Sequence, residues 1–196
     1  MTDAPPSRAD SQRDRVVRTS VDIFSRRGFR ATSMNEIASG VGLSKPTLYH
    51  YFRSKDEILV RIYSEVLDES LRMARATVDR APTPLAAIRD LITSRVVYTC
   101  ENQALLKICF EEEHELPSAL AEQLLRRRHA FEDVFSAALH AHLQDHRDIV
   151  LGMPPKVYVN MCLGAANWTY KWYRVGGPCT PHELGSQLAL ALTEVI

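Results

Sequence analysis

The strongest constraint on the fold of this chain is the spacing of its apolar residues, which recur every three or four positions along most of its length. Residues 11–27, for example, place Val17, Val21 and Phe24 on one side of a helix. No run alternates apolar and polar residues between hairpin turns, as a half-buried β-strand would. The pattern predicts an all-α protein.

Capping residues and helix breakers divide the chain into nine expected helices. Ser33, Ser54 and Thr180 are each followed three positions later by Glu, the spacing of a capping box, which satisfies exposed N–H groups of a first helical turn. Glycine and proline mark other helix ends and starts. The expected helices cover approximately residues 11–27, 33–41, 44–51, 54–81, 84–102, 103–114, 117–140, 154–175 and 181–196.

The segment from Met34 to Arg53 fits the steric requirements of a helix-turn-helix at four positions. Ala38 is small where the two helices cross, and Gly42 suits a turn that needs a positive φ. Leu48 and Tyr51 lie where the second helix must pack apolar groups onto the first. The combination predicts a motif whose second helix enters the major groove of DNA.

The polar side chains that this packing leaves outward are the expected DNA contacts. On the second helix they are Ser44, Lys45, Thr47, Tyr49 and His50. Lysine can bind a guanine edge or a phosphate, and threonine can contact a thymine methyl group. Thr32, Ser33 and Lys55, near helix N-termini, are expected to add phosphate contacts. The alternative is that all of these are ordinary surface residues.

Residues 11–57 resemble the DNA-binding domain of the TetR family of transcription regulators. The resemblance is carried by the stretch FSRRGFRATSMNEIASGVGLSKPTLYHYFRSKDEIL, in which the Thr32-Ser33 helix start, Gly42 and Leu48 occupy family positions. It implies a homodimer that binds a palindromic operator in double-stranded DNA. It also implies a repressor that releases this operator when a small molecule enters the C-terminal domain.

The segment from Asn167 to Pro178 resembles the end of the penultimate helix in TetR-type regulators of lipid and sterol breakdown that sense acyl-CoA thioesters. This second resemblance implies an acyl-CoA effector. The uncharged Leu163 and Asn167 depart from the more basic helix that such sensors can carry. Two alternatives stay open: the aromatic residues form only core and interface, or the protein controls an efflux or detoxification gene and senses an aromatic or drug-like ligand.

The expected effector site gathers residues from three of the predicted helices. Its members are Val97, Cys100, Phe131, Phe135, Trp168, Lys171, Trp172 and Arg174. The resemblance implies that the two tryptophans lie near the acyl chain or the dimer seam. It further implies that Lys171 or Arg174 pairs with coenzyme A phosphates.

The composition favours a chain that stays in the cytoplasm. No apolar run approaches the ~20 residues needed to cross a bilayer, and the polar stretch MTDAPPSRADSQRDR lacks the apolar middle of a secretory signal. Residues 1–10 are expected to form a disordered arm. The four cysteines show neither metal-ligand spacing nor a disulfide framework, and are expected as core thiols.

The formal net charge of zero hides a gradient along the chain. Residues 1–60 carry 10 Lys and Arg against 7 Asp and Glu, whereas residues 61–196 carry 14 against 17, which gives +3 and −3. This polarity would present the N-terminal end to phosphates. The gradient permits DNA binding without proving it, because three charges are a modest excess.

For the other candidate sites, an ordinary structural role is favoured over a functional one. The acidic run 111–115 and the pair His142 and His146 could hold a metal, but carboxylate runs on helices are usually solvated faces, and no metal is expected. The basic triplet 126–128 is interpreted as a solvated face in the same way. No Gly-rich phosphate loop, nucleophile elbow or paired-His metalloprotease helix is present in the sequence, so an enzyme is not expected.

The last two predicted helices, 154–175 and 181–196, carry apolar stripes wider than one subunit can bury. They predict a homodimer in which these helices form a four-helix seam. The expected domain plan is a DNA-binding domain over residues 11–57 and a ligand-binding and dimerisation domain over residues 58–196.

Overall fold

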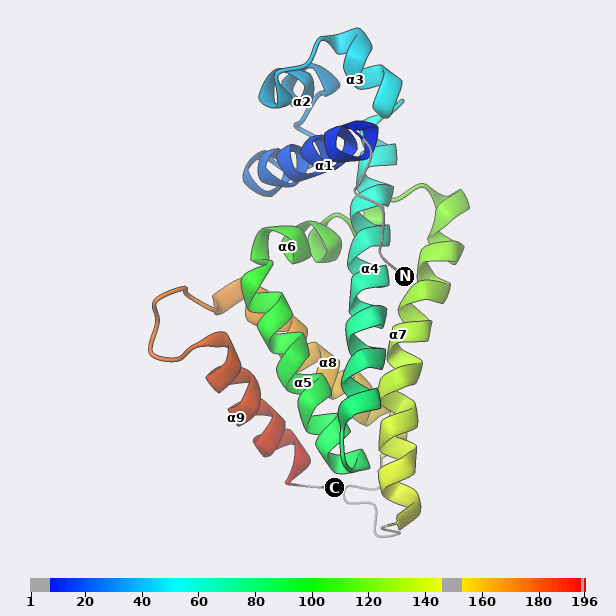
Figure 1. The fold of residues 1–196 in the computed structure, drawn as a ribbon, viewed down its shortest axis with the longest axis vertical. Helices are drawn as coiled ribbons and strands as arrows, with labels where there is room; N and C mark the ends of the chain where they lie inside the picture. The colour runs from blue at the N-terminus through cyan, green and yellow to red at the C-terminus, as the bar shows by residue number, and fades with distance from the viewer. Residues whose placement is uncertain (1–7, 146–152, 195) are drawn as a thin grey trace. The chain divides into compact units, whose positions relative to one another are not determined.

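The computed structural model describes residues 8–145, 153–194 and 196, in which helices are joined by short loops and no strand is present. The expectation of an all-α fold with nine α-helices in the described part of the chain is confirmed (Figure 1). The elements are α1 (Arg8–Arg27), α2 (Met34–Val41), α3 (Lys45–Tyr51), α4 (Lys55–Arg80), α5 (Pro84–Glu101), α6 (Gln103–Glu111), the 3₁₀ helix η1 (Glu113–Glu115), α7 (Ser118–Asp145), α8 (Pro155–Trp172) and α9 (Pro181–Thr193).

Several helix ends differ from the expectation, among them the end of α7, which lies at Asp145 rather than near residue 140. Helix α1 begins at Arg8, so residues 8–10, which were expected in a disordered arm, are helical; residues 1–7 lie outside the described part. Helix α8 ends at Trp172 rather than near residue 175, because Tyr173 turns into an extended conformation and buries its side chain. The amide of Gln103 fixes this end by donating to the carbonyls of Tyr170 and Tyr173, at 3.1 and 3.0 Å.

The chain forms two compact units whose boundaries fall inside α4 and α7. The first unit comprises the described residues up to Glu65 together with Ala104–Ala121, and the second comprises Val66–Gln103 and the described part of Glu122–Ile196. Helix α6 and η1 therefore lie in the same unit as α1, α2 and α3, although about forty residues of the second unit separate them in the sequence.

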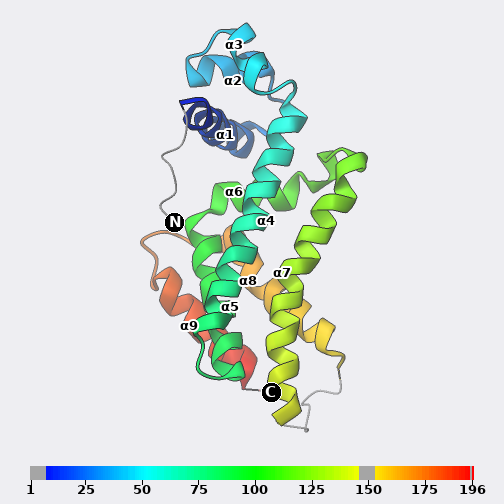
Figure 2. The ribbon, with the colours of Figure 1, turned by 45° about the vertical axis from the view of Figure 1, so that its right-hand side comes forward.

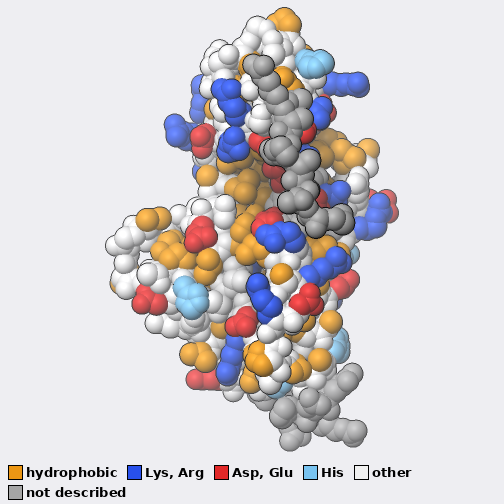
Figure 3. Space-filling model, viewed as in Figure 1, with side chains coloured by type: hydrophobic (Ala, Val, Ile, Leu, Met, Phe, Trp, Pro, Cys, Tyr) orange, Lys and Arg blue, Asp and Glu red, His pale blue; other side chains and the backbone are white. Residues whose placement is uncertain are grey.

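The first unit packs its short helices around large apolar side chains. Phe24 and Phe29 meet edge to face with ring centres 5.1 Å apart, and Ile37 and Leu48 are fully buried. Aromatic pairs of this geometry stabilise a core beyond the area that they bury. Lys and Arg side chains are scattered over the surface of these helices (Figure 3).

In the second unit, α9 lies beside α5 in both ribbon views (Figures 1 and 2). The contact is close because Gly185 of α9 lies against Thr93 of α5: a Cβ at Gly185 would be 2.9 Å from the Thr93 carbonyl oxygen. Helix α8 joins them through Tyr158, whose hydroxyl donates to the Leu192 carbonyl at 2.9 Å. A larger cluster that includes Phe135 of α7 completes this core. None of the helices in the described ranges has the length and apolar character that a membrane span requires.

Candidate nucleic-acid interface and internal cavity

Helix α2 begins with the capping box predicted for it. The Glu36 backbone N–H donates to the Ser33 hydroxyl at 3.3 Å, and the Ser33 N–H donates back to the Glu36 carboxylate at 2.8 Å. The Ser33 N–H and the Ser33 hydroxyl, which also donates to the Glu36 carboxylate at 3.0 Å, lower the pKa of Glu36 below its ordinary value of 4.5, with help from the charge of Arg27. The first turn of α2 is thereby fixed.

The turn between α2 and α3 depends on Gly42, whose φ is +74°. Its N–H donates to the Ser39 carbonyl at 3.1 Å, and the Leu43 N–H donates to the Ala38 carbonyl at 2.9 Å. This left-handed C-terminal cap strains any residue with a Cβ. The cap thereby sets the direction of α3 relative to α2.

Helix α3 has one buried side chain, Leu48, which is 0% exposed. Ser44 caps the helix by accepting from the Thr47 N–H at 3.3 Å, and proline is accommodated in the first turn, where its missing N–H is not needed. Lys45 lies with its Nζ 5.9 Å from the ring centre of Tyr49. The side chains expected to contact DNA are exposed: Ser44, Lys45, Thr47, Tyr49 and His50.

The three remaining predicted phosphate contacts are engaged in internal hydrogen bonds. Thr32 is 3% exposed and its hydroxyl donates to the Gly28 carbonyl at 2.9 Å. Lys55 donates to the carbonyls of Phe29, Arg30 and Thr32 at 2.8, 3.2 and 3.2 Å. The Ser33 hydroxyl is held in the capping box. These side chains therefore build the loop that presents α2 and α3.

That loop is also held by carboxylates from η1 and from Glu112, the residue between α6 and η1. The Phe29 N–H donates to Glu112 at 3.2 Å, and Arg30 forms an ion pair with Glu115. Glu112, His114 and Glu115 bring one ligand atom each within 4.8 Å of one another. Because two of the three already bond to the loop, the group is better described as a structural clamp. This clamp could not be foreseen from the sequence, since it joins residues more than eighty positions apart.

The second unit contains a small cavity between α4, α5 and α7 with a volume of about 10 Å³. Its lining is apolar and aromatic with a few polar groups: Ser70, Met73, Ala74, Leu91, Ser94, Arg95, Tyr98 and Phe131. Arg95 is 9% exposed, and sequence reasoning missed it. A signal existed, because Arg95 continues the apolar stripe of Ile88 and Ile92 at helical spacing, so a charge had to lie on the buried face.

The predicted effector residues are dispersed over the second unit. Phe131 lines the cavity, whereas Phe135 is 1% exposed in the main core. Cys100 belongs to a separate small cluster near the C-terminal end of α5, where burial raises the pKa of its thiol. Val97 is half-buried on α5.

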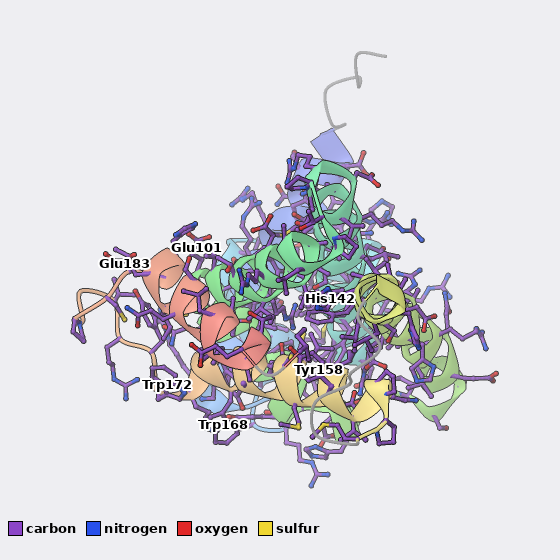
Figure 4. The ribbon with its side chains drawn as sticks, turned by 90° about the horizontal axis from the view of Figure 1, so that it is seen from below. Glu101, His142, Tyr158, Trp168, Trp172 and Glu183 are labelled. Carbon is purple, nitrogen blue, oxygen red and sulfur yellow. The ribbon has the colours of Figure 1, made fainter. Side chains whose placement is uncertain are left out.

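The four predicted residues near the end of α8 are exposed. Figure 4 shows Trp168 and Trp172 on the outer side of α8; they are 59% and 49% exposed. Lys171 lies with its Nζ 6.0 Å from the ring centre of Trp168, and Arg174 donates to the Tyr173 carbonyl at 3.2 Å.

The remaining candidates form ordinary helix contacts. Arg127 donates to Asp68 on α4 at 3.0 Å, and Arg126 pairs with Glu122 one turn away on α7. His142 is buried on α7. His146, its proposed metal-binding partner, lies outside the described residues.

Known protein families match both the N-terminal helices and the C-terminal part of the chain. Residues 16–62 match the bacterial regulatory proteins of the tetR family, and residues 81–196 match the tetracyclin repressor-like C-terminal domain. The HTH-type transcriptional repressor KstR2 of Mycobacterium tuberculosis is 26% identical over 198 residues, which cover 97% of this chain and 96% of KstR2.

Solved structures share the fold. The ketosteroid transcriptional regulator KstR2 of Mycobacterium tuberculosis aligns with a TM-score of 0.83 at 24% identity, covering 95% of each chain. AibR, solved in complex with isovaleryl coenzyme A and operator DNA, aligns with a TM-score of 0.83 at 20% identity, covering 94% of this chain and all of AibR. The family consists of regulatory proteins, which confirms the expectation of a regulator rather than an enzyme. The chain belongs to the TetR family of transcriptional regulators.

Proposed function

We propose that this protein is a transcriptional repressor that binds a palindromic operator and releases it when a small hydrophobic effector binds. The observation that carries the proposal is the geometry of α3, in which Leu48 is buried while Lys45, Thr47, Tyr49 and His50 face solvent. In this arrangement the outward face of α3 reads base edges in the major groove. The relative KstR2 is named a transcriptional repressor, which supports repression rather than activation.

The repressor acts as a homodimer through α8 and α9. Val157, Met161, Trp168 and Trp172 form an exposed stripe along α8, each between 44% and 59% exposed, and Leu190 on α9 is 50% exposed. Large apolar side chains in a continuous stripe are typical of a surface that a second subunit covers. A twofold dimer presents two copies of α3 to half-sites about 34 Å apart.

The effector is an acyl-CoA thioester that binds the second unit. AibR, with the same fold, was solved with isovaleryl coenzyme A. Lys171 and Arg174 are exposed near the end of α8, and in this proposal they bind the coenzyme A phosphates. The aromatic lining by Tyr98 and Phe131 supports a second candidate, an aromatic or drug-like effector of an efflux or detoxification regulator.

The DNA-binding part of the proposal is tested by fluorescence anisotropy with DNA fragments that flank the gene. Lys45→Ala and Tyr49→Ala should each weaken specific binding about tenfold or more, because each removes a contact worth roughly 1–3 kcal/mol. Arg75→Ala, which removes an exposed charge from the second unit, is the matched control and should bind as the wild type does. Unchanged affinity of both α3 variants would refute the proposal.

Sedimentation equilibrium tests the dimer. Trp168→Asp should yield monomers, because a charge in the middle of the α8 stripe would be buried at the seam. Leu125→Asp, at an apolar position on α7 that is 43% exposed, serves as the control and should remain dimeric. A wild-type chain that sediments as a monomer would exclude the seam.

Titration of effectors into a preformed protein–DNA complex separates the two effector classes. Acyl-CoA thioesters of increasing chain length should release the DNA, with an optimum at one length. Release by aromatic compounds alone would favour the second candidate, and indifference to every acyl-CoA would eliminate the first.

A further inference from the structure

Gly164 lies in the middle of α8, and nothing in the described part of the chain requires a glycine there. A glycine inside a helix is less favourable than an alanine, because its backbone loses more conformational freedom on folding. The φ of Gly164 is not positive, and a Cβ at this position would meet no described atom within 4 Å. The cost of this glycine is therefore not offset by a contact or a backbone conformation inside one subunit.

The other described glycines each have a local cause. Three adopt a positive φ, and at three others a Cβ would lie 2.9–3.0 Å from a neighbouring atom. The first set is Gly28, Gly42 and Gly176, and the second is Gly40, Gly177 and Gly185. Gly164 is exposed and belongs to neither set. This contrast places the reason for Gly164 outside the subunit.

Gly164 occupies the centre of the apolar stripe of α8. Val157 and Met161 precede it and Trp168 and Trp172 follow it, at helical spacings of four, three, four and four residues. These four side chains are 44–59% exposed, and the two tryptophans lie on the outer side of α8 in Figure 4. The stripe therefore has large side chains toward both ends and exposed backbone at its midpoint.

We infer that α8 crosses the α8 of a second copy at Gly164, beside the twofold axis of the dimer. The inference rests on the proposed function, because it takes α8 to lie in the dimer seam. In a twofold interface a residue meets its own copy only next to the axis. Glycine in both subunits at that point lets the two backbones approach closely, because the distance between packed helices depends on the side chains at the contact. Met161 and Trp168, about one turn away on either side, then pack against the partner helix.

The charges on the two seam helices favour a second copy over a different partner. Helix α8 carries Lys156 and Lys171 and no carboxylate, whereas α9 carries Glu183 and no lysine or arginine. All three side chains are exposed. A twofold arrangement that places α8 of each subunit beside α9 of the other therefore brings opposite charges together twice.

Substitution of Gly164 tests the inference, because its effects on dimerisation and on folding should have opposite signs. Gly164→Ala should weaken dimerisation about tenfold in sedimentation equilibrium, and Gly164→Leu should weaken it further, since each added side chain separates the helices. In the Trp168→Asp background, which the proposed seam makes monomeric, Gly164→Ala should instead raise the midpoint of thermal unfolding, because alanine favours the helix and meets no neighbour. Gln123→Leu adds a side chain at an exposed position of α7 and, as the control, should leave the dimer unchanged.

Disulfide formation between subunits locates the crossing point. All variants carry Cys179→Ser, which removes the half-buried thiol and leaves the three buried ones. At concentrations at which the variants are dimeric, Gly164→Cys should form a disulfide with its own copy when oxidised by copper phenanthroline. Trp172→Cys is the matched control: it lies about 12 Å further along the helix, so its two copies are too far apart to be joined.

The outcomes separate the crossing point from the proposed function. Wild-type dimerisation of both Gly164→Ala and Gly164→Leu would overturn the inference. So would a dimer in which Gly164→Cys forms no disulfide, or forms one no faster than Trp172→Cys. If Trp168→Asp still yields monomers in these cases, the seam stands and the crossing point alone is wrong. A monomeric wild type would refute both. A dimer that depends on Gly164 but binds no DNA sequence specifically would support the crossing and refute the repressor.

Discussion

The helices that present the exposed side chains of α3 and the cavity in the second unit are built in opposite ways. The first depends on residues that are neighbours in the sequence, such as the Ser33 and Glu36 pair and the turn at Gly42. The second depends on Ser70, Arg95 and Asn167, which meet only because three helices pack together. A site made of local signals can be found in a sequence, whereas one assembled by packing requires the fold.

The largest effects should follow from removing the main apolar anchor of each region. Leu48→Ala and Phe135→Ala should destabilise the protein by roughly 2–5 and 3–5 kcal/mol, because both side chains are at most 1% exposed. Thermal unfolding measures both. The regions should differ in function: Leu48→Ala should abolish DNA binding at a temperature where the protein is folded, since α3 has no other buried side chain.

Leu125→Ala is the control for these two variants, because Leu125 is 43% exposed, and it should change the free energy of unfolding by less than about 0.5 kcal/mol. Wild-type DNA affinity in Leu48→Ala would mean that α3 is positioned by something other than its packing.

Alanine substitutions at two glycines compare the two regions again, and their expected effects on stability are of intermediate size. At Gly185 a Cβ would meet backbone atoms of Thr93, so Gly185→Ala must separate α9 from α5, at a cost of roughly 1–3 kcal/mol. At Gly42 a Cβ meets nothing within 4 Å, and Gly42→Ala adds only backbone strain, about 1–2 kcal/mol. Chemical denaturation gives both values.

Asparagine distinguishes the two causes, because it tolerates a left-handed backbone. Gly42→Asn should recover much of the loss, and Gly185→Asn should be worse than alanine. The reverse order would contradict the distinction between strain and overlap.

The capping boxes of α2 and α9 should contribute smaller and similar amounts. Ser33→Ala and Thr180→Ala each remove a hydroxyl that accepts from the backbone N–H of the Glu three residues later. The expected loss is about 1 kcal/mol each, measured by hydrogen exchange in the first turn of the affected helix. Ser33→Thr and Thr180→Ser keep the hydroxyl and should retain protection. Loss of protection from hydrogen exchange throughout the protein would show that the effect of each cap extends beyond its own helix.

The pH dependence of these boxes should be the smallest effect. Hydrogen bonds from Ser33 and Thr180 lower the pKa of Glu36 and Glu183 below the ordinary value of 4.5. A lowered carboxyl pKa stabilises the folded state above pH 4.5, and this contribution is lost as the pH falls through the folded-state pKa. NMR titration of both carboxyls checks the direction. Ser33→Ala should raise the pKa of Glu36 and leave the pKa of Glu183 unchanged. A shift of both pKa values would contradict the expectation that the two capping boxes act independently.

Most helix boundaries could be predicted because their signals lie within one turn. Thr83 and Thr180 cap α5 and α9, and Gly42 ends α2, as their residue types required. The early start of α1 at Arg8 was missed, because residues 8–10 carry no large apolar side chain to begin the helical stripe. The end of α8 was missed because Gln103, seventy residues away in the sequence, binds the last carbonyls.

The same distinction explains the candidate sites. The exposure of Lys45 and Tyr49 followed from the local pattern, whereas the bonds of Lys55 to three carbonyls depend on how a loop folds back onto α4. The cavity could not be outlined from the sequence, because helical spacing shows which residues are buried but not which of them border a space. Arg95 was visible as a charge in an apolar stripe, yet its partners were not.

The clamp formed by Glu112 and Glu115 on the loop at Phe29 and Arg30 has a consequence for exchanging parts between relatives. A chimera that receives only the first 60 residues from another regulator would pair a foreign loop with native carboxylates. Matching the donor also over 104–121 restores both partners. We therefore expect the first unit to be transplanted intact only when both stretches of the gene come from the same donor.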